Sequence, residues 1–187
     1  MPGFREHSDL ILAEIGRALA AVDDEQVRIL IDAILGSEKV FVVGVGRVLL
    51  CLQAFVKRLN HLGIGAWFVG EINEPAIGPR DLLIVGSGSG ESVVTLAIAR
   101  VARQHGARIA HIGSNPESSM KPLADHFLRI PVSTRLELPG EILSRQIMTS
   151  LFEQCLLILG DAIALEIAER RQVGDIHSLR RFHANLE

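Results

Sequence analysis

The sequence predicts an α/β protein of three layers, in which a doubly wound, five-stranded parallel sheet of flavodoxin-like strand order is flanked by helices on both faces. The first observation is that short apolar runs alternate along the chain with longer segments in which apolar residues recur at helical spacing. The second is that the first and third apolar runs end in Gly-rich turns. Right-handed crossovers are compatible with an order in which those two strands are neighbours. We expect the 187 residues to form one domain.

The predicted helices start at acidic or turn residues, and several of them stop at a glycine. In chain order they are expected over about 4–21, 23–35, 47–62, 91–105, 116–124 and 141–171. Within the third of these, Leu50, Ala54, Leu59 and Leu62 are the expected core positions. The domain is thus expected to comprise N-terminal helices at 1–36, an α/β core at 39–171 and a C-terminal tail at 172–187.

The predicted strands are short, continuous apolar runs, as expected for strands that are buried on both faces. In chain order they are 40–43, 66–69, 82–85, 108–112 and 127–130. The first strand leaves through Gly44-Val45-Gly46, and the third leaves through Gly86-Ser87-Gly88-Ser89-Gly90. Because ligands of such sheets bind beyond the carboxyl ends of the strands, we expect both turns to border one crevice.

Composition narrows the class of protein. The net charge of −3 offers no basic surface for nucleic acid, and no run approaches the ~20 apolar residues of a membrane span. The mean hydropathy of +0.31 is high, and a buried sheet together with an apolar subunit interface would explain it, so we expect a homo-oligomer. Cys51 and Cys155 lack metal or redox spacing and are expected to be buried thiols. Residues 1–5 open no signal core, so we expect a cytoplasmic location.

The turn after the third strand has the composition of an anion-binding loop. Its glycines permit positive φ angles, Ser87 and Ser89 supply hydroxyls, and Glu91 and Ser92 open a helix whose free N–H groups point back at the loop. This arrangement suits phosphate or another small anion. The alternative is an ordinary strand-to-helix turn, in which Ser89 or Ser92 only caps the helix.

Other ligand classes fit the sequence less well. A dinucleotide fingerprint would need a third glycine at the position of Leu49, although Glu71 ends the second strand where a ribose-binding acid could lie. There is no Gly-Lys-Ser/Thr triplet, no His-Glu-x-x-His and no convincing nucleophile elbow. The sequence therefore gives no support for metal or acyl-transfer chemistry.

The loop from Ser87 to Ser92, Ser-Gly-Ser-Gly-Glu-Ser, resembles the Ser-Gly-Ser-Gly-Glu-Thr signature of the SIS (sugar isomerase) domain. Four further stretches resemble 6-phospho-3-hexuloisomerases, namely 58–63, 69–71, 150–154 and the terminal His-Ala-Asn-Leu-Glu at 183–187. The resemblance implies interconversion of 3-hexulose 6-phosphate and fructose 6-phosphate, as in the ribulose monophosphate pathway, without cofactor or metal. It also implies a homotetramer with its sites near subunit interfaces.

One departure from the family bears on the phosphate site. The family has Gly-x-Gly-Arg-Ser-Gly after the first strand, whereas this chain has Gly44-Val45-Gly46-Arg47-Val48-Leu49, so Val48 replaces a hydroxyl expected to reach phosphate. The residues left to bind substrate by resemblance are Gly44, Gly46, Arg47, Ser87, Gly88, Ser89, Glu91 and Ser92. Two alternatives remain open, an isomerase of another sugar phosphate and a protein that binds sugar phosphate without turnover.

Isomerisation requires a base that moves a proton between C2 and C3 through an enediol. Glu153 is the first candidate, because it lies beside Leu151 and Phe152, where burial is expected to raise its pKa. His61, in a family-like motif, is a second proton carrier or else caps its helix, and Glu71 is the rival base. His183, with Glu187, either completes a neighbouring subunit's site or only anchors the tail.

Overall fold

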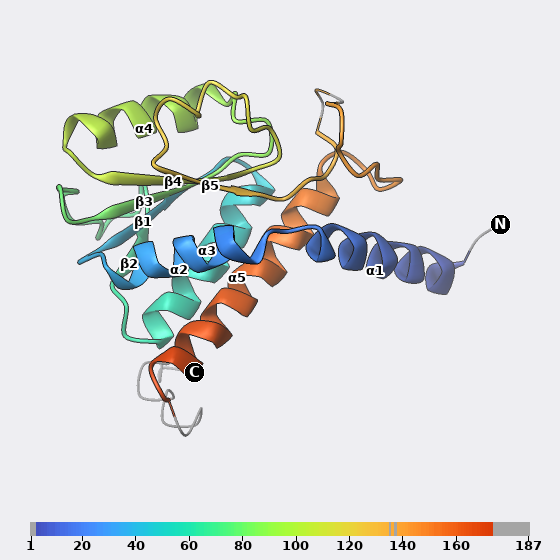
Figure 1. Ribbon diagram of the computed structural model, residues 1–187, viewed down its shortest axis with the longest axis horizontal. Helices are drawn as coiled ribbons and strands as arrows, with labels where there is room; N and C mark the ends of the chain where they lie inside the picture. Colours follow the sequence, from blue (N-terminus) through green and yellow to red (C-terminus); the bar gives the residue numbers. More distant parts are fainter. Residues whose placement is uncertain (1–2, 135, 137, 174–187) are drawn as a thin grey trace.

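The computed structural model describes residues 3–134, 136 and 138–173 (Figure 1). Its sheet comprises β1 (Val40–Val43), β2 (Ala66–Phe68), β3 (Leu82–Gly86), β4 (Arg108–Gly113) and β5 (His126–Arg129). All neighbouring strands are parallel, and their order is β2-β1-β3-β4-β5. The predicted α/β fold with flavodoxin-like strand order is confirmed.

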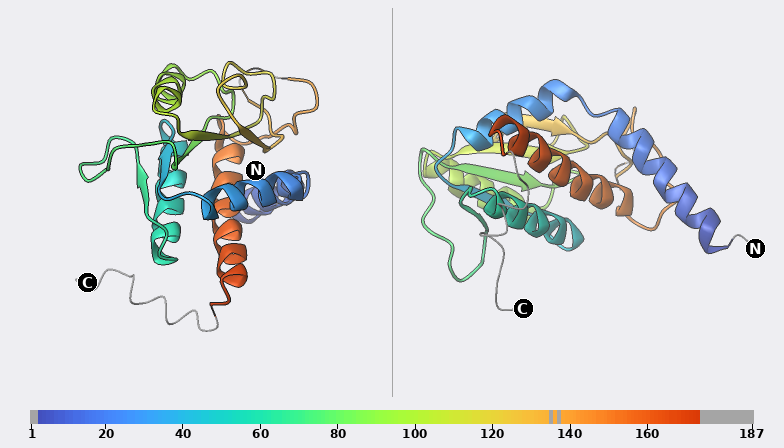
Figure 2. Two further views of the ribbon diagram at one scale, coloured as in Figure 1. Left: turned by 60° about the vertical axis from the view of Figure 1, so that its left-hand side comes forward. Right: turned by 90° about the horizontal axis from the view of Figure 1, so that it is seen from below.

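The helices form the two outer layers. On one face lie α2 (Asp24–Leu35), α3 (Arg47–His61) and α5 (Ser150–Arg170), and on the other lies α4 (Val93–Gln104) (Figures 1 and 2). The N-terminal α1 (Phe4–Ala20) packs against α5 and extends beyond the sheet (Figure 2). The structure therefore has three layers.

Alternating residues of the central strands supply the two cores. On β1, Val40 and Val42 pack with the layer that contains α2, α3 and α5, whereas Phe41 and Val43 pack with the layer that contains α4. Every residue of β1 and β3 is buried, as expected for strands covered on both faces. Because β1 and β3 pair in register from Val40 with Leu82 to Val43 with Val85, their two exit turns leave the sheet at the same level.

Two helix predictions are wrong. Residues 116–124 form turns, because the Asn115 side chain accepts a hydrogen bond from the Glu117 amide and Pro122 cannot continue a helix. Residues 141–149 also lie outside α5, which begins at Ser150. Here the Glu141 carboxylate accepts hydrogen bonds from the Thr134 and Leu138 amides, so local side-chain bonding replaces the helix.

Of the core positions predicted for the helix α3, Leu59 is confirmed and Leu62 packs partly buried against the core, whereas Leu50 and Ala54 are wrong. Leu52, Phe55 and Leu59 are buried, whereas Leu50 and Ala54 are exposed. Cys155 is buried and Cys51 is half-buried, and burial raises the pKa of Cys155 to about 11. The Cys155 thiol therefore stays neutral at physiological pH. Across the described residues, no helix has both the length and the apolar character needed to cross a membrane.

Candidate functional site

A crevice of about 630 Å³ lies at the carboxyl ends of β1 and β3. Its walls comprise residues 45–48 after β1, Gly86 at the end of β3, residues 87–89 and 91–93 after β3, and Thr134, Met148, Thr149, Phe152 and Glu153. The prediction that the two Gly-rich turns border one crevice is confirmed. The volume lies in the range of pockets that bind small molecules.

The carbonyl groups of the 87–92 loop are held by residues that follow or lie in β4. The Ser87 carbonyl accepts a hydrogen bond from Nε2 of His111 at 2.9 Å. The Gly88 carbonyl accepts from the backbone amides of Ser114, at 2.8 Å, and Asn115, at 3.2 Å. His111 is only 1% exposed, and burial lowers its pKa, so a neutral ring donates to Ser87. These hydrogen bonds hold the loop against β4 and the residues that follow it.

The amide groups of the same loop remain available. Within the described part of the chain, the backbone amides of Gly88, Ser89 and Ser92 donate no hydrogen bond. Because the carbonyls are engaged, these amides form a run of donors of the kind that binds anions. The helices α3 and α4 both begin at the crevice, so their positive dipole ends add to the attraction.

The serine hydroxyls do not serve as helix caps. The Ser87 hydroxyl accepts from the Gly90 amide at 3.1 Å, and the Ser89 hydroxyl accepts from the Glu91 amide at 3.3 Å. Ser92 is the N-cap residue of α4, but its side chain makes no capping hydrogen bond. Among the described residues, all three hydroxyl protons are therefore free to be donated to a ligand, which favours the anion-binding interpretation over the capping alternative.

Close packing explains one glycine of the turn and the role of Val48. A Cβ atom on Gly86 would lie 2.8 Å from Cδ1 of Leu52 and 2.9 Å from Cγ1 of Val48. A Cβ atom on Gly44 would lie 3.2 Å from the same Val48 methyl group. Val48 therefore packs against the ends of both central strands while it borders the crevice.

Glu153 lies in the first turn of α5, buried beside Phe152. Its Oε2 accepts a hydrogen bond from Nε of Arg47, and its Oε1 accepts one from Oγ1 of Thr149 at 3.1 Å. The hydrogen bond to Glu153 raises the pKa of Arg47. The predicted burial of Glu153 is confirmed, and both Glu153 and Arg47 border the crevice.

Glu91 also borders the crevice, and its Oε1 accepts a hydrogen bond from the Ser119 amide at 2.7 Å. The hydrogen bonds from Ser119 lower the pKa of Glu91, so this carboxylate is charged at neutral pH. The Glu91 side chain therefore connects the 87–92 loop to the segment that follows β4.

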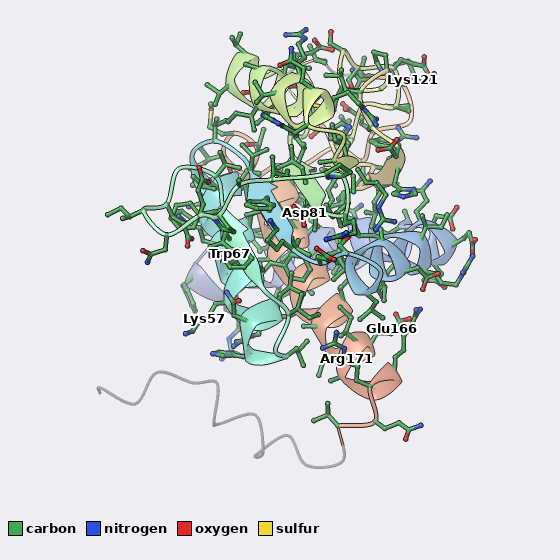
Figure 3. All side chains as sticks on the ribbon, turned by 90° about the vertical axis from the view of Figure 1, so that its left-hand side faces the viewer. Lys57, Trp67, Asp81, Lys121, Glu166 and Arg171 are labelled. Atoms are coloured by element: carbon green, nitrogen blue, oxygen red, sulfur yellow. The ribbon has the colours of Figure 1, made fainter. Side chains whose placement is uncertain are left out.

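Neither His61 nor Glu71 is among the residues that line the crevice. His61 is the last residue of α3, roughly 21 Å along the helix from Arg47 at 1.5 Å per residue. In Figure 3, Lys57 lies in the C-terminal half of α3, and Arg171 directly follows α5. Glu71 follows the edge strand β2, and its carboxylate accepts from the Phe68 amide at 3.4 Å. His183 and Glu187 lie outside the described residues.

Sequence reasoning missed several residues of the site. Thr149, four residues before Glu153, orients its carboxylate. A hydroxyl residue four positions before an acid in a predicted helix is a sequence signal that could have identified this contact. His111 was assigned no role, although a histidine inside an apolar strand run is itself a signal of a buried polar contact. No signal in the sequence marks Thr134 or Met148, which reach the crevice from an irregular segment. Within the described residues, no group of three or more potential metal ligands occurs.

Comparisons with known proteins place this geometry in a family. The profile of the SIS domain matches residues 33–158. A Bacillus subtilis protein named 3-hexulose-6-phosphate isomerase is 38% identical over 177 residues, which cover 95% of each chain. A Mycobacterium gastri protein of the same name is 38% identical over 178 residues, 95% of this chain and 88% of that one.

A solved structure from Methanococcus jannaschii, described as inferring a molecular function of 3-hexulose-6-phosphate isomerase, gives the same result in three dimensions. It is 30% identical, covers 97% of this chain and 99% of its own, and superposes with a TM-score of 0.82. The similarity to these proteins extends over almost the whole chain. The chain belongs to the SIS domain family.

Proposed function

We propose that this protein is a 3-hexulose-6-phosphate isomerase, which interconverts 3-hexulose 6-phosphate and fructose 6-phosphate through an enediol without a cofactor. The observation that carries the proposal is the placement of an anion-binding loop and a buried carboxylate on one crevice. Relatives that align over 95% of the chain have this name, and the sequence-based prediction of a sugar-phosphate isomerase agrees with them.

The loop from Ser87 to Ser92 supplies the phosphate site. Three free amides, three hydroxyl protons and two helix N-termini face a ligand that carries a double negative charge. A phosphate fixed there leaves the carbon chain of the sugar to extend across the crevice. Orientation is thus achieved by a group that takes no part in the chemistry, which lowers the entropic cost of the proton transfer.

Glu153 is the proposed base. It would remove the proton from one of the two carbons and return it to the other, a role worth roughly 10²–10⁴ in rate. Thr149 holds one carboxylate oxygen, so the direction of the other is fixed. Because the C6 oxygen of a 3-hexulose 6-phosphate is esterified, no ordinary five- or six-membered ring closes on its C3 carbonyl, and little ring-opening machinery is needed.

The proposal extends to a cytoplasmic homotetramer with sites near its interfaces. The adjacent helices α3 and α5 expose apolar side chains, including Leu50 at 63% and Leu165 at 61%, which an assembly would cover. In such an assembly, His61 would reach only the crevice of another copy of the chain, and we propose the same for His183. Sedimentation at micromolar concentration should give a species well above the 20.4 kDa monomer, and a stable monomer would contradict the assembly.

The deciding experiment is turnover in deuterated water, followed by proton NMR at C2, on a panel of sugar phosphates. The wild type should isomerise 3-hexulose 6-phosphate, and Glu153→Gln should reduce kcat by about 10² or more while substrate still binds. Glu169→Gln, on the same helix and exposed, is the matched control and should keep its rate. If the wild type binds sugar phosphates tightly but turns over none of them, the protein instead binds sugar phosphates without catalysis.

A further inference from the structure

Both oxygens of the proposed catalytic carboxylate are occupied in the ligand-free protein. Oε2 of Glu153 accepts from Nε of Arg47, and Oε1 accepts from Thr149. An oxygen that accepts a hydrogen bond from a guanidinium is not free to approach a C–H bond of a substrate until that hydrogen bond breaks. A base held in this way is poorly prepared to take a proton from carbon.

The two partners differ in their freedom to move. The Glu153 side chain is 9% exposed, whereas the Arg47 side chain is 66% exposed. Arg47 uses Nε alone among its five N–H donors, and Glu153 is its only partner within the described part of the chain. The carboxylate is therefore the fixed member of the pair, and the guanidinium is the member that can swing.

A second destination for the guanidinium borders the same crevice. The amides of Gly88, Ser89 and Ser92 face it without partners among the described residues, and Arg47 itself borders it from the start of α3. A tetrahedral dianion on that loop would bring two negative charges opposite the single charge of Glu153. Guanidinium binds such an anion with two parallel hydrogen bonds, which it does not make to Glu153 in this structure.

We propose that Arg47 is a positioning residue that pairs with Glu153 in the ligand-free protein and transfers to the phosphate group of the bound substrate, so that phosphate binding frees the base. This inference rests on the proposed function of the site. It couples occupancy of the phosphate loop to proton transfer and disfavours reaction with sugars that lack the phosphate. Cys51, also on α3, interacts electrostatically with Glu153, and its pKa is raised by burial and by that carboxylate, so this thiol adds no charge at neutral pH.

The test is calorimetric and needs no turnover. Sulfate is the probe, because it is a tetrahedral dianion that does not itself take up protons at mildly acidic pH. Its binding is measured in two buffers of different ionisation enthalpy, which gives the number of protons taken up by the protein. The wild type should take up protons as the ion pair opens, and Glu153→Gln should take up fewer, the remainder coming from Glu91, the other carboxylate that borders the crevice. Arg47→Gln should bind sulfate about 10-fold to 150-fold more weakly, the range of a charge-assisted hydrogen bond, and take up fewer protons than the wild type.

Two further variants sharpen the result. Arg47→Lys keeps the charge and should restore part of the affinity and of the proton uptake. Arg58→Gln is the matched control, because Arg58 forms a similar α3–α5 ion pair with Asp161 away from the crevice, and it should behave as the wild type. Proton uptake in Arg47→Gln that equals or exceeds that of the wild type would overturn the transfer and leave the proposed function intact. Failure of the wild type to bind sulfate would overturn both.

Discussion

Gly90 is the glycine of the 87–92 loop at which an added side chain would meet the closest contacts. Its φ angle is +68°, and a Cβ atom there would lie 2.4 Å from both Cβ and Oγ of Ser118 and 3.1 Å from Cε1 of His111. Gly90→Ala therefore combines a left-handed backbone cost of about 1–2 kcal/mol with an overpacking cost of about 1–3 kcal/mol. The sum, about 2–5 kcal/mol, corresponds to a fall in Tm of about 4–20 °C for a chain of this size.

The assay is thermal unfolding together with sulfate binding. Gly88→Ala is the matched control for stability, because its Cβ would make only ordinary contacts, the nearest at 3.5 Å. Ser118→Gly removes the two atoms that a Cβ on residue 90 would overlap. Added to Gly90→Ala, it should restore the stability lost to overpacking but not the stability lost to the left-handed backbone conformation. A wild-type Tm and sulfate affinity in Gly90→Ala would refute the reasoning, and so would a double variant no more stable than Gly90→Ala.

Three other predictions concern the serine hydroxyls of the loop, the packing of Val48, and the stability that Glu14 gives the protein at different pH. Ser87→Ala and Ser89→Ala should each weaken fructose 6-phosphate binding by about 1.5–3 kcal/mol, and fructose 6-phosphate but not fructose should raise the wild-type Tm; equal stabilisation by both sugars would contradict a phosphate site. Val48→Ser should lower the Tm without improving KM, because this side chain packs against the ends of β1 and β3; a lower KM at unchanged Tm would instead identify a lost phosphate ligand. Glu14→Gln should destabilise the protein at neutral pH and much less in acid, as melting curves across pH would show.

The sequence was sufficient for the sheet and for one side of the site, because both depend on local signals. A continuous apolar run that ends in Gly and Ser predicts a buried strand followed by a turn suited to an anion, and the structure has the strand at 82–86 and places the turn that follows it at the crevice. The same holds for the turn after β1. Strand order followed from general rules of handedness rather than from particular residues.

The other side of the site depends on contacts between distant residues, which no local pattern encodes. Arg47 and Glu153 are 106 residues apart and meet only because α3 and α5 pack side by side. The irregular segment 141–149 also depends in part on a distant contact, since Glu14 of α1 accepts hydrogen bonds from the Ser144 hydroxyl and the Arg145 amide. His61 lies in a motif that resembles that of the family, but the motif does not place its side chain, which α3 carries to the end away from Arg47.

A buried carboxylate on α1 connects this irregular segment to the acid stability of the site. Glu14 is 1% exposed, and its oxygens accept from Oγ of Ser144 at 2.7 Å, the Arg145 amide at 2.9 Å and Nε2 of Gln146 at 3.0 Å. Burial raises the pKa of Glu14, but these hydrogen bonds, with the charge of Arg17, outweigh burial and lower it below its usual value.

A lowered pKa in the folded state means that Glu14 stabilises the fold above the pKa of the unfolded chain, about 4.3, and that this contribution is lost as pH falls through the lower folded value. The segment that Glu14 holds leads directly to Met148 and Thr149 at the crevice. Acid should therefore loosen the support of Glu153 before it unfolds the sheet. Hydrogen exchange should show residues 141–149 losing protection in acid ahead of β1 and β3, and simultaneous loss in all three would show that Glu14 acts only on global stability.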